Sequence, residues 1–137
     1  MAHTIFDKYR EEEILNADPV QLVDMLFRGA IDAVGAARRH LAAGEIRPRS
    51  RQIVKAWEIL LELNRSLNHS QGGDLSRNLA SLYAYMQTRL MEANSSQSDP
   101  PLLEVERLLT TLQEGWQQVP SLEVSAQEER EPLSCTC

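Results

Sequence analysis

Cysteines, aromatic side chains and long apolar runs are all scarce in this 137-residue sequence. The two cysteines, Cys135 and Cys137, lie within the last three residues, so neither can crosslink distant parts of the fold. No apolar run approaches the roughly 20 residues of a membrane-spanning helix, and the charged N-terminal stretch lacks the apolar region of a signal peptide. We therefore expect a protein that stays in the cytosol and does not insert into a membrane.

The composition favours a single helical domain. The chain has only two Phe, two Trp and three Tyr, while leucine and alanine are abundant, and this balance is typical of helices rather than sheets. A length of 137 residues suits one hydrophobic core. The net charge of -6 and the pI near 5.1 disfavour attraction to phosphate backbones, so we expect no nucleic-acid partner.

The sequence carries no motif for catalysis or metal binding. It lacks the Glu-x-x-His pair of di-iron bundles, a Walker loop, a serine nucleophile elbow and a CxxC pair. His3, His40 and His69 stand alone, with no second ligand at metal-binding spacing. We therefore predict that the protein is not an enzyme and that it binds no cofactor and no metal.

Two other functions stay open at this point. In a histidine-phosphotransfer bundle, His40 or His69 would accept a phosphoryl group, but the stretch from His40 to Gly44 lacks the lysine of that signature. Gly44 also falls where a helix should end, so a capping role already explains it. The other alternative is a structural subunit that self-associates through its apolar faces.

The first helix has clear boundary signals. Asp18 can cap it, Pro19 suits the first helical position, and Gln21 can complete a capping box. Gly44 offers a left-handed cap at the other end. Helix one is therefore predicted to run from Pro19 to just before Gly44.

Prolines, glycines and polar loops delimit three further helices. The expected boundaries are Pro48 and Gly72-Gly73 for helix two, Asp74 and the polar loop 94–98 for helix three, and Asp99-Pro100-Pro101 and Pro120 for helix four. Each helix repeats apolar residues at helical spacing. The predicted core stripes include Val23, Phe27 and Val34; Ile53, Trp57, Leu60 and Leu67; Leu75, Leu79, Leu82, Met86 and Leu90; and Leu102, Val105, Leu109, Leu112 and Trp116.

Four helices joined by short connections favour an all-α, antiparallel, up-down-up-down four-helix bundle. The bundle is predicted to occupy residues 18–119. Residues 1–17 would form an extended or short helical cap, and the polar residues 120–137 are expected to form a disordered tail.

Helices one and two carry more apolar surface than a core-facing side requires. On a helical wheel, helix four covers roughly 120 degrees, whereas helix two covers roughly 220 degrees. The apolar arc of helix two is widened by Val54, Ile59, Leu61 and Leu63. The arc in the first half of helix one is widened by Leu22, Met25 and Leu26. Two explanations stay open: the arcs pack between neighbouring helices, or they line a groove for an amphipathic segment.

Basic residues gather around the first interhelical turn. They are Arg38, Arg39, Arg47, Arg49, Arg51 and Lys55, opposed locally only by Glu45. This cluster could meet an acidic partner, or it could be a solvated loop that places cations near the end of helix one.

The order of these elements resembles the FliS family of flagellin export chaperones over roughly residues 5–119. The opening Tyr9, Ala17-Asp18-Pro19 and Leu22-Val23 fit the family, as does the stretch Met25 to Ile31. The most specific stretch runs from Leu79 to Met86, with sequence LASLYAYM, and a late tryptophan, Trp116, follows. Phe27, Arg28 and Asn68 depart from the residues that are common in the family.

The resemblance implies a partner. FliS proteins bind the disordered C-terminal segment of flagellin in the cytoplasm, suppress premature polymerisation and assist delivery to the flagellar export apparatus. A free chain that is a monomer or a weak dimer is expected. The wide arcs suit such a partner, because amphipathic helices need an apolar surface.

On this reading, partner-binding residues are expected on three helices and in the N-terminal segment. Phe6, Tyr9 and Ile14 would form a lid or rim over the empty groove. The groove itself would be lined by Leu22, Met25, Leu26, Ile59, Leu61, Leu63, Leu75, Leu79 and Tyr83. For most of these residues, packing in the core is the alternative.

Overall fold

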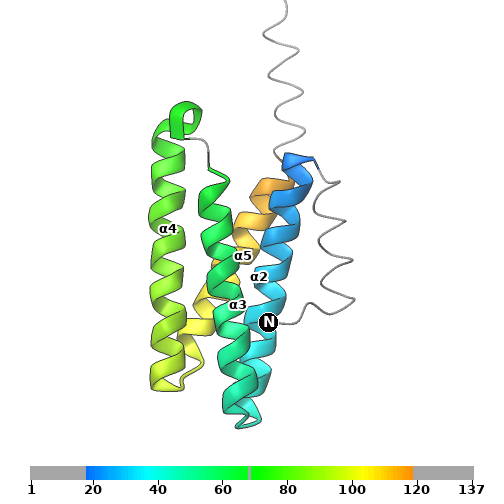
Figure 1. Cartoon of the computed structure of the whole chain (residues 1–137), viewed down its shortest axis with the longest axis vertical. Coiled ribbons are helices and arrows are strands. Elements are labelled where there is room, and N and C mark those ends of the chain that lie inside the picture. Colours follow the sequence, from blue (N-terminus) through cyan, green and yellow to red (C-terminus); the bar gives the residue numbers. More distant parts are fainter. Residues whose placement is uncertain (1–17, 68, 119–137) are drawn as a thin grey trace, which may run out of the picture.

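The computed structural model describes residues 18–67 and 69–118, and these residues form a helical bundle. Its helices are α2 (Pro19–Ala42), α3 (Ile46–Arg65), α4 (His69–Ser96) and α5 (Pro100–Gln117). Consecutive helices run in alternating directions, as the colours of Figure 1 show. The predicted all-α, four-helix bundle is therefore confirmed for the described part of the chain, which contains no strand.

The four helices form a closed arrangement in which α2 and α4 lie on opposite sides. Each of these two helices packs mainly against both α3 and α5. Helix α5 runs obliquely behind α3 (Figure 1). The first turns of α2 and α4 and the last turns of α3 and α5 consequently meet at one end of the bundle.

Helix α2 begins and ends as predicted. An oxygen of the Asp18 carboxylate accepts a hydrogen bond from the Gln21 backbone amide at 2.8 Å, and the Gln21 side chain accepts one from the Asp18 amide at 3.3 Å. This reciprocal pair satisfies two amides that have no partner within the helix. At the other end, Gly44 adopts a φ of 73°, the left-handed conformation that favours glycine.

The predicted start of helix two was wrong, whereas the predicted start of helix three at Asp74 coincides with the point where regular helical geometry resumes after Gly73. Helix α3 begins at Ile46, so Pro48 lies within its first turn, where the missing amide removes no helical hydrogen bond. It ends at Arg65, well before the glycine pair. Helix α4 already starts at His69, and Gly73, with φ 53° and ψ −126°, is a kink inside it. The glycine pair thus marks a break just before Asp74, and the end of α3 lies earlier in the chain, at Arg65.

At the far end of the chain, α5 stops at Gln117, before the predicted stop at Pro120. The predicted cap segment 1–17 and the predicted disordered tail from residue 120 lie outside the described residues.

The core lies along the middle of the bundle and contains residues from all four helices. Its largest fully buried side chains are Val34, Ile53, Leu60, Leu63, Met86, Leu90, Leu102, Val105 and Leu109. Burial of each such side chain contributes about 1.5 to 3 kcal/mol. All except Leu63 belong to the predicted core stripes. Leu75, from the same prediction, is instead 65% exposed.

The basic cluster predicted around the first turn is divided by tertiary contacts. Arg38 donates two hydrogen bonds to the Asp99 carboxylate, at 2.8 and 3.1 Å, and so ties α2 to the start of α5. Arg49 is only 5% exposed, and its guanidinium donates to the backbone and side-chain oxygens of Asn94. These two arginines hold helices together and are not part of a free surface patch.

We expect Asp18→Ala to lower the free energy of unfolding by about 1 kcal/mol, because it removes the capping box. Urea unfolding followed by circular dichroism measures the change. Asp32→Ala is the matched control, since Asp32 is exposed in the middle of α2 and alanine is the better helix former. Equal losses in both variants would contradict a capping role for Asp18.

Candidate functional site

An apolar pocket of about 540 Å³ lies at the end of the bundle where α2 and α4 begin and α5 ends. We call it the end pocket. None of the described residues that line it carries a charge. They are Val23 and Phe27 of α2; Ser66 and Leu67 after α3; Gly72, Leu75, Ser76, Leu79 and Tyr83 of α4; and Thr111, Leu112, Gly115 and Trp116 of α5.

One wall of the end pocket is formed where α5 is attached to α2. The indole nitrogen of Trp116 donates a hydrogen bond to the backbone oxygen of Val20 at 3.0 Å. One turn along α2, the side-chain amides of Gln113 and Gln117 both donate to the Asp24 carboxylate. These contacts place the Trp116 ring against α2 and keep the last turns of α5 close to it.

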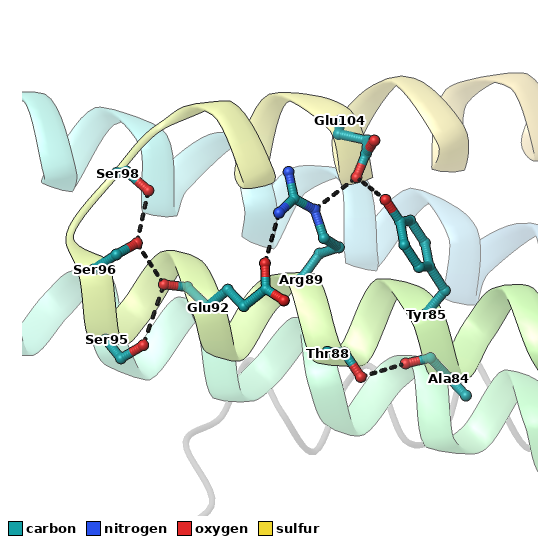
Figure 2. A network of polar contacts seen from close by, with 9 residues as sticks. All are labelled: Ala84, Tyr85, Thr88, Arg89, Glu92, Ser95, Ser96, Ser98 and Glu104. Atoms are coloured by element: carbon teal, nitrogen blue, oxygen red, sulfur yellow. Dashed lines mark hydrogen bonds and ion pairs between the residues drawn. The ribbon is translucent and has the colours of Figure 1, made fainter.

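Helix α4 is attached to α5 away from the end pocket, through a polar network (Figure 2). One carboxylate oxygen of Glu104 accepts hydrogen bonds from the Tyr85 hydroxyl at 2.6 Å and from the Arg89 guanidinium at 2.7 Å. These bonds, the Tyr85 bond first, lower the pKa of Glu104. The bond to Glu104 in turn raises the pKa of Tyr85. Because the network is exposed, it fixes how α4 sits on α5 more than it adds stability.

The end pocket therefore lies between α4 on one side and the attached pair α2 and α5 on the other, and α4 is joined to α5 elsewhere. Helix α5 follows α2 at this end, whereas the network holds α4 to α5 nearer the other end. The kink at Gly73 redirects the first residues of α4 over the gap. Gly72, just before the kink, is among the lining residues.

Tyr83 forms part of the pocket lining and also belongs to the buried core. It is 3% exposed, and burial raises the pKa of its phenol to about 12. The phenol therefore stays neutral, as a hydrogen-bond donor, throughout the physiological pH range.

Three of the predicted partner-binding residues come together in this pocket: Leu75, Leu79 and Tyr83. Leu22, Met25 and Leu26 on α2, and Ile59 and Leu61 on α3, are partly exposed but do not line it. Leu63 is fully buried, so the structure places it in the core and not in a groove. Phe6, Tyr9 and Ile14 lie outside the described residues.

The sequence prediction missed the pocket residues of α2 and α5. Val23, Phe27, Leu112 and Trp116 belong to the predicted core stripes, and core packing explained them fully. A possible signal was their position, since all four lie in the turns nearest one end of the bundle. Apolar residues near the end of a helix line a pocket when the neighbouring helix does not cover them.

The phosphotransfer candidate His40 lies near the end of α2. Its Nδ1 atom is 3.0 Å from the Glu45 carboxylate, and its side chain is partly buried. This contact lies at the opposite end of α2 from Val23 and Phe27, so His40 takes no part in the end pocket.

Comparison with known proteins identifies the family of this chain. The family described as "Flagellar protein FliS" matches residues 1–123 of the sequence. The chain belongs to the FliS family.

Three relatives in this family are named flagellar secretion chaperones. The chain is 37% identical over 121 residues to FliS of Salmonella typhimurium, covering 88% of this chain and 89% of the relative. It is 35% identical over 106 residues to FliSB of Pseudomonas aeruginosa, covering 77% and 84%. It is 29% identical over 111 residues to FliS of Vibrio cholerae, covering 80% and 81%.

Within the described residues of this family member, no helix combines the length and the hydropathy needed to cross a bilayer.

We expect the free energy of unfolding to fall as pH rises from about 10 to about 12. The unfolded chain releases the Tyr83 proton near pH 10, whereas the folded chain holds it to about pH 12. The contribution is therefore fully present below the unfolded pKa and is lost as pH rises through the folded one.

The variant Tyr83→Phe lacks this titrating phenol. Its stability at high pH therefore reports the effect of all other groups that ionise there. Urea unfolding of both proteins at about pH 9 and about pH 11.5 measures the difference. A stability difference that stays constant between the two pH values would contradict the burial of the phenol.

Proposed function

We propose that this chain is a cytoplasmic export chaperone that binds the C-terminal segment of flagellin. It prevents premature polymerisation and assists delivery to the flagellar export apparatus. The observation that carries the proposal is the uncharged, apolar end pocket, in a chain whose relatives are named flagellar secretion chaperones.

The end pocket has the chemistry of a helix-binding groove. Its volume falls within the roughly 300 to 1,000 Å³ typical of binding sites, and leucines and aromatic rings from α2, α4 and α5 line it. An amphipathic helix presents apolar anchors every three or four residues to such a surface. Burial of two or three leucine-sized anchors offsets the 2 to 5 kcal/mol or more that it costs to order a disordered segment.

The contact extends beyond the end pocket. A disordered partner wraps over a long surface, because the entropy lost when each residue becomes ordered must be offset by buried apolar area. Leu22, Met25 and Leu26 on α2 and Ile59 and Leu61 on α3 are partly exposed apolar residues that can serve this purpose. Leu63 is not among them, since it is fully buried.

The N-terminal segment supplies a lid for the empty pocket in this proposal. Helix α2 begins at Pro19, and Val23, one turn later, already lines the end pocket. Asp18, the first described residue, is therefore separated from the pocket residue Val23 by little more than one helical turn. Phe6, Tyr9 and Ile14 are the apolar side chains that would cover the pocket until flagellin displaces them.

We expect Leu75→Asp to weaken the binding of a flagellin C-terminal fragment about tenfold or more, as loss of a hot-spot anchor does. Leu75 is 65% exposed at the pocket rim, so the change should leave the fold intact. Isothermal titration calorimetry measures the affinity, and circular dichroism checks the fold.

Met91→Asp is the matched control. Met91 is 45% exposed on a different surface, between α3 and α4, and its substitution should change the affinity less than about twofold. Failure of the unmodified chain to bind the fragment would disprove the proposed function. Equal weakening in both variants would show that the end pocket is not the docking site.

Deletion of residues 1–15 should tighten binding of the same fragment, because a lid that occupies the pocket lowers the fraction of binding-competent molecules. Competition titrations of the full and shortened chains measure the ratio of the two dissociation constants. Weaker binding after the deletion would instead mean that these residues contact flagellin directly.

A further inference from the structure

The Tyr83 hydroxyl is a polar group without a partner in an apolar pocket. No described residue forms a hydrogen bond with it, although the side chain is 3% exposed. Two other polar groups at the pocket have partners: the Trp116 indole donates to Val20 and the Ser66 hydroxyl to Leu63. Two residues along α4, the Tyr85 hydroxyl donates to Glu104.

This hydroxyl faces open space and is not sealed inside the protein. Among the described residues, the fully enclosed side-chain atom without a hydrogen-bond partner is Asn64 Oδ1, and the Tyr83 oxygen is not enclosed in this way. Since Tyr83 lines the end pocket, its remaining accessible surface borders the pocket. A water molecule can reach the hydroxyl while the pocket is empty.

A docked helix changes the environment of the hydroxyl. An occupant with a purely apolar face would expel water and leave the donor unpaired, which costs about as much as a lost hydrogen bond. A site that holds a buried polar group therefore discriminates against ligands without a matching group. Backbone carbonyls in the middle of a docked helix are already bonded, so the acceptor must come from a side chain or from a helix end.

The charge of the pocket decides which side chain is suitable. A carboxylate would lose its hydration in a pocket whose described lining residues include no cation to compensate it. A neutral amide does not carry this cost. Its oxygen can accept from Tyr83, and its nitrogen can donate to the hydroxyl oxygen of Ser66 or Thr111, both of which line the pocket.

We propose that Tyr83 selects an amphipathic helix that carries an asparagine or glutamine within its apolar face, by donating a hydrogen bond to that amide oxygen. This inference rests on the proposed function, since it takes the docked helix to be the flagellin segment. The burial that raises the pKa of the phenol keeps it a donor at all physiological pH values.

The test compares the unmodified full chain, Tyr83→Phe and Tyr85→Phe in titrations against a flagellin C-terminal fragment. Tyr83→Phe should weaken binding about five- to tenfold, the value of one hydrogen bond. Its urea midpoint near pH 7 should be unchanged or higher, because the free chain loses no hydrogen bond. Tyr85→Phe removes a hydroxyl outside the pocket and should leave the affinity unchanged.

The second arm changes the fragment. Each asparagine or glutamine on its apolar face is replaced in turn by leucine or methionine of similar shape. One such replacement should weaken binding to the unmodified chain five- to tenfold and have no further effect on binding to Tyr83→Phe. This loss of additivity identifies the pair that is in contact.

The outcomes separate the two proposals. If the unmodified chain does not bind the fragment, the proposed function fails. If it binds and Tyr83→Phe binds equally tightly, the proposed function stands and the role of Tyr83 is wrong. If Tyr83→Phe binds weakly but no amide replacement is coupled to it, the acceptor is another group, such as a hydroxyl or a backbone carbonyl, and selection by an amide is disproved.

Discussion

The attachment of α5 to α2 at both ends is the constraint on which the end pocket depends. Near the start of α5, Arg38 holds Asp99 through two hydrogen bonds. Near its last turn, Trp116 holds the backbone of Val20. With α5 attached to α2 in this way, the first turns of α4 border an opening between the three helices. A helix fixed by only one of these contacts could pivot and fill that space.

Tyr83 and Tyr85 show how two residues of one helix acquire opposite roles. They lie two positions apart on α4, so their side chains face different sides. Tyr85 lies at the surface, where its hydroxyl bonds Glu104 and helps to hold α4 on α5 (Figure 2). Tyr83 faces inward, where burial raises the pKa of its phenol and no described residue satisfies its hydroxyl. Tyr85 thus helps to hold the helices together, whereas the Tyr83 hydroxyl keeps a hydrogen bond to offer to a partner.

The distribution of charge supports a division between scaffold and binding surface. Arg38, Arg49 and Arg89 all form contacts between helices and so act within the scaffold. In the part of the chain that the structure describes, no charged residue lines the end pocket. Affinity for a partner there would come from apolar burial, which is not directional, and specificity would have to come from the few hydroxyl groups at the site.

The sequence by itself determined the elements of this protein, because helix boundaries and core stripes depend on local chemistry. The capping box of Asp18, the left-handed Gly44 and buried residues such as Leu60 and Leu109 could all be predicted from residue type and spacing. The Gly72-Gly73 pair correctly predicted an interruption before Asp74, but not the additional helical turn that begins at His69, since glycine permits both a helix end and a kink. The tertiary structure alone decided which apolar residues line the pocket. Helical spacing shows that Leu63 and Leu79 are apolar positions, but the neighbouring helices determine that Leu63 is enclosed and Leu79 borders an opening.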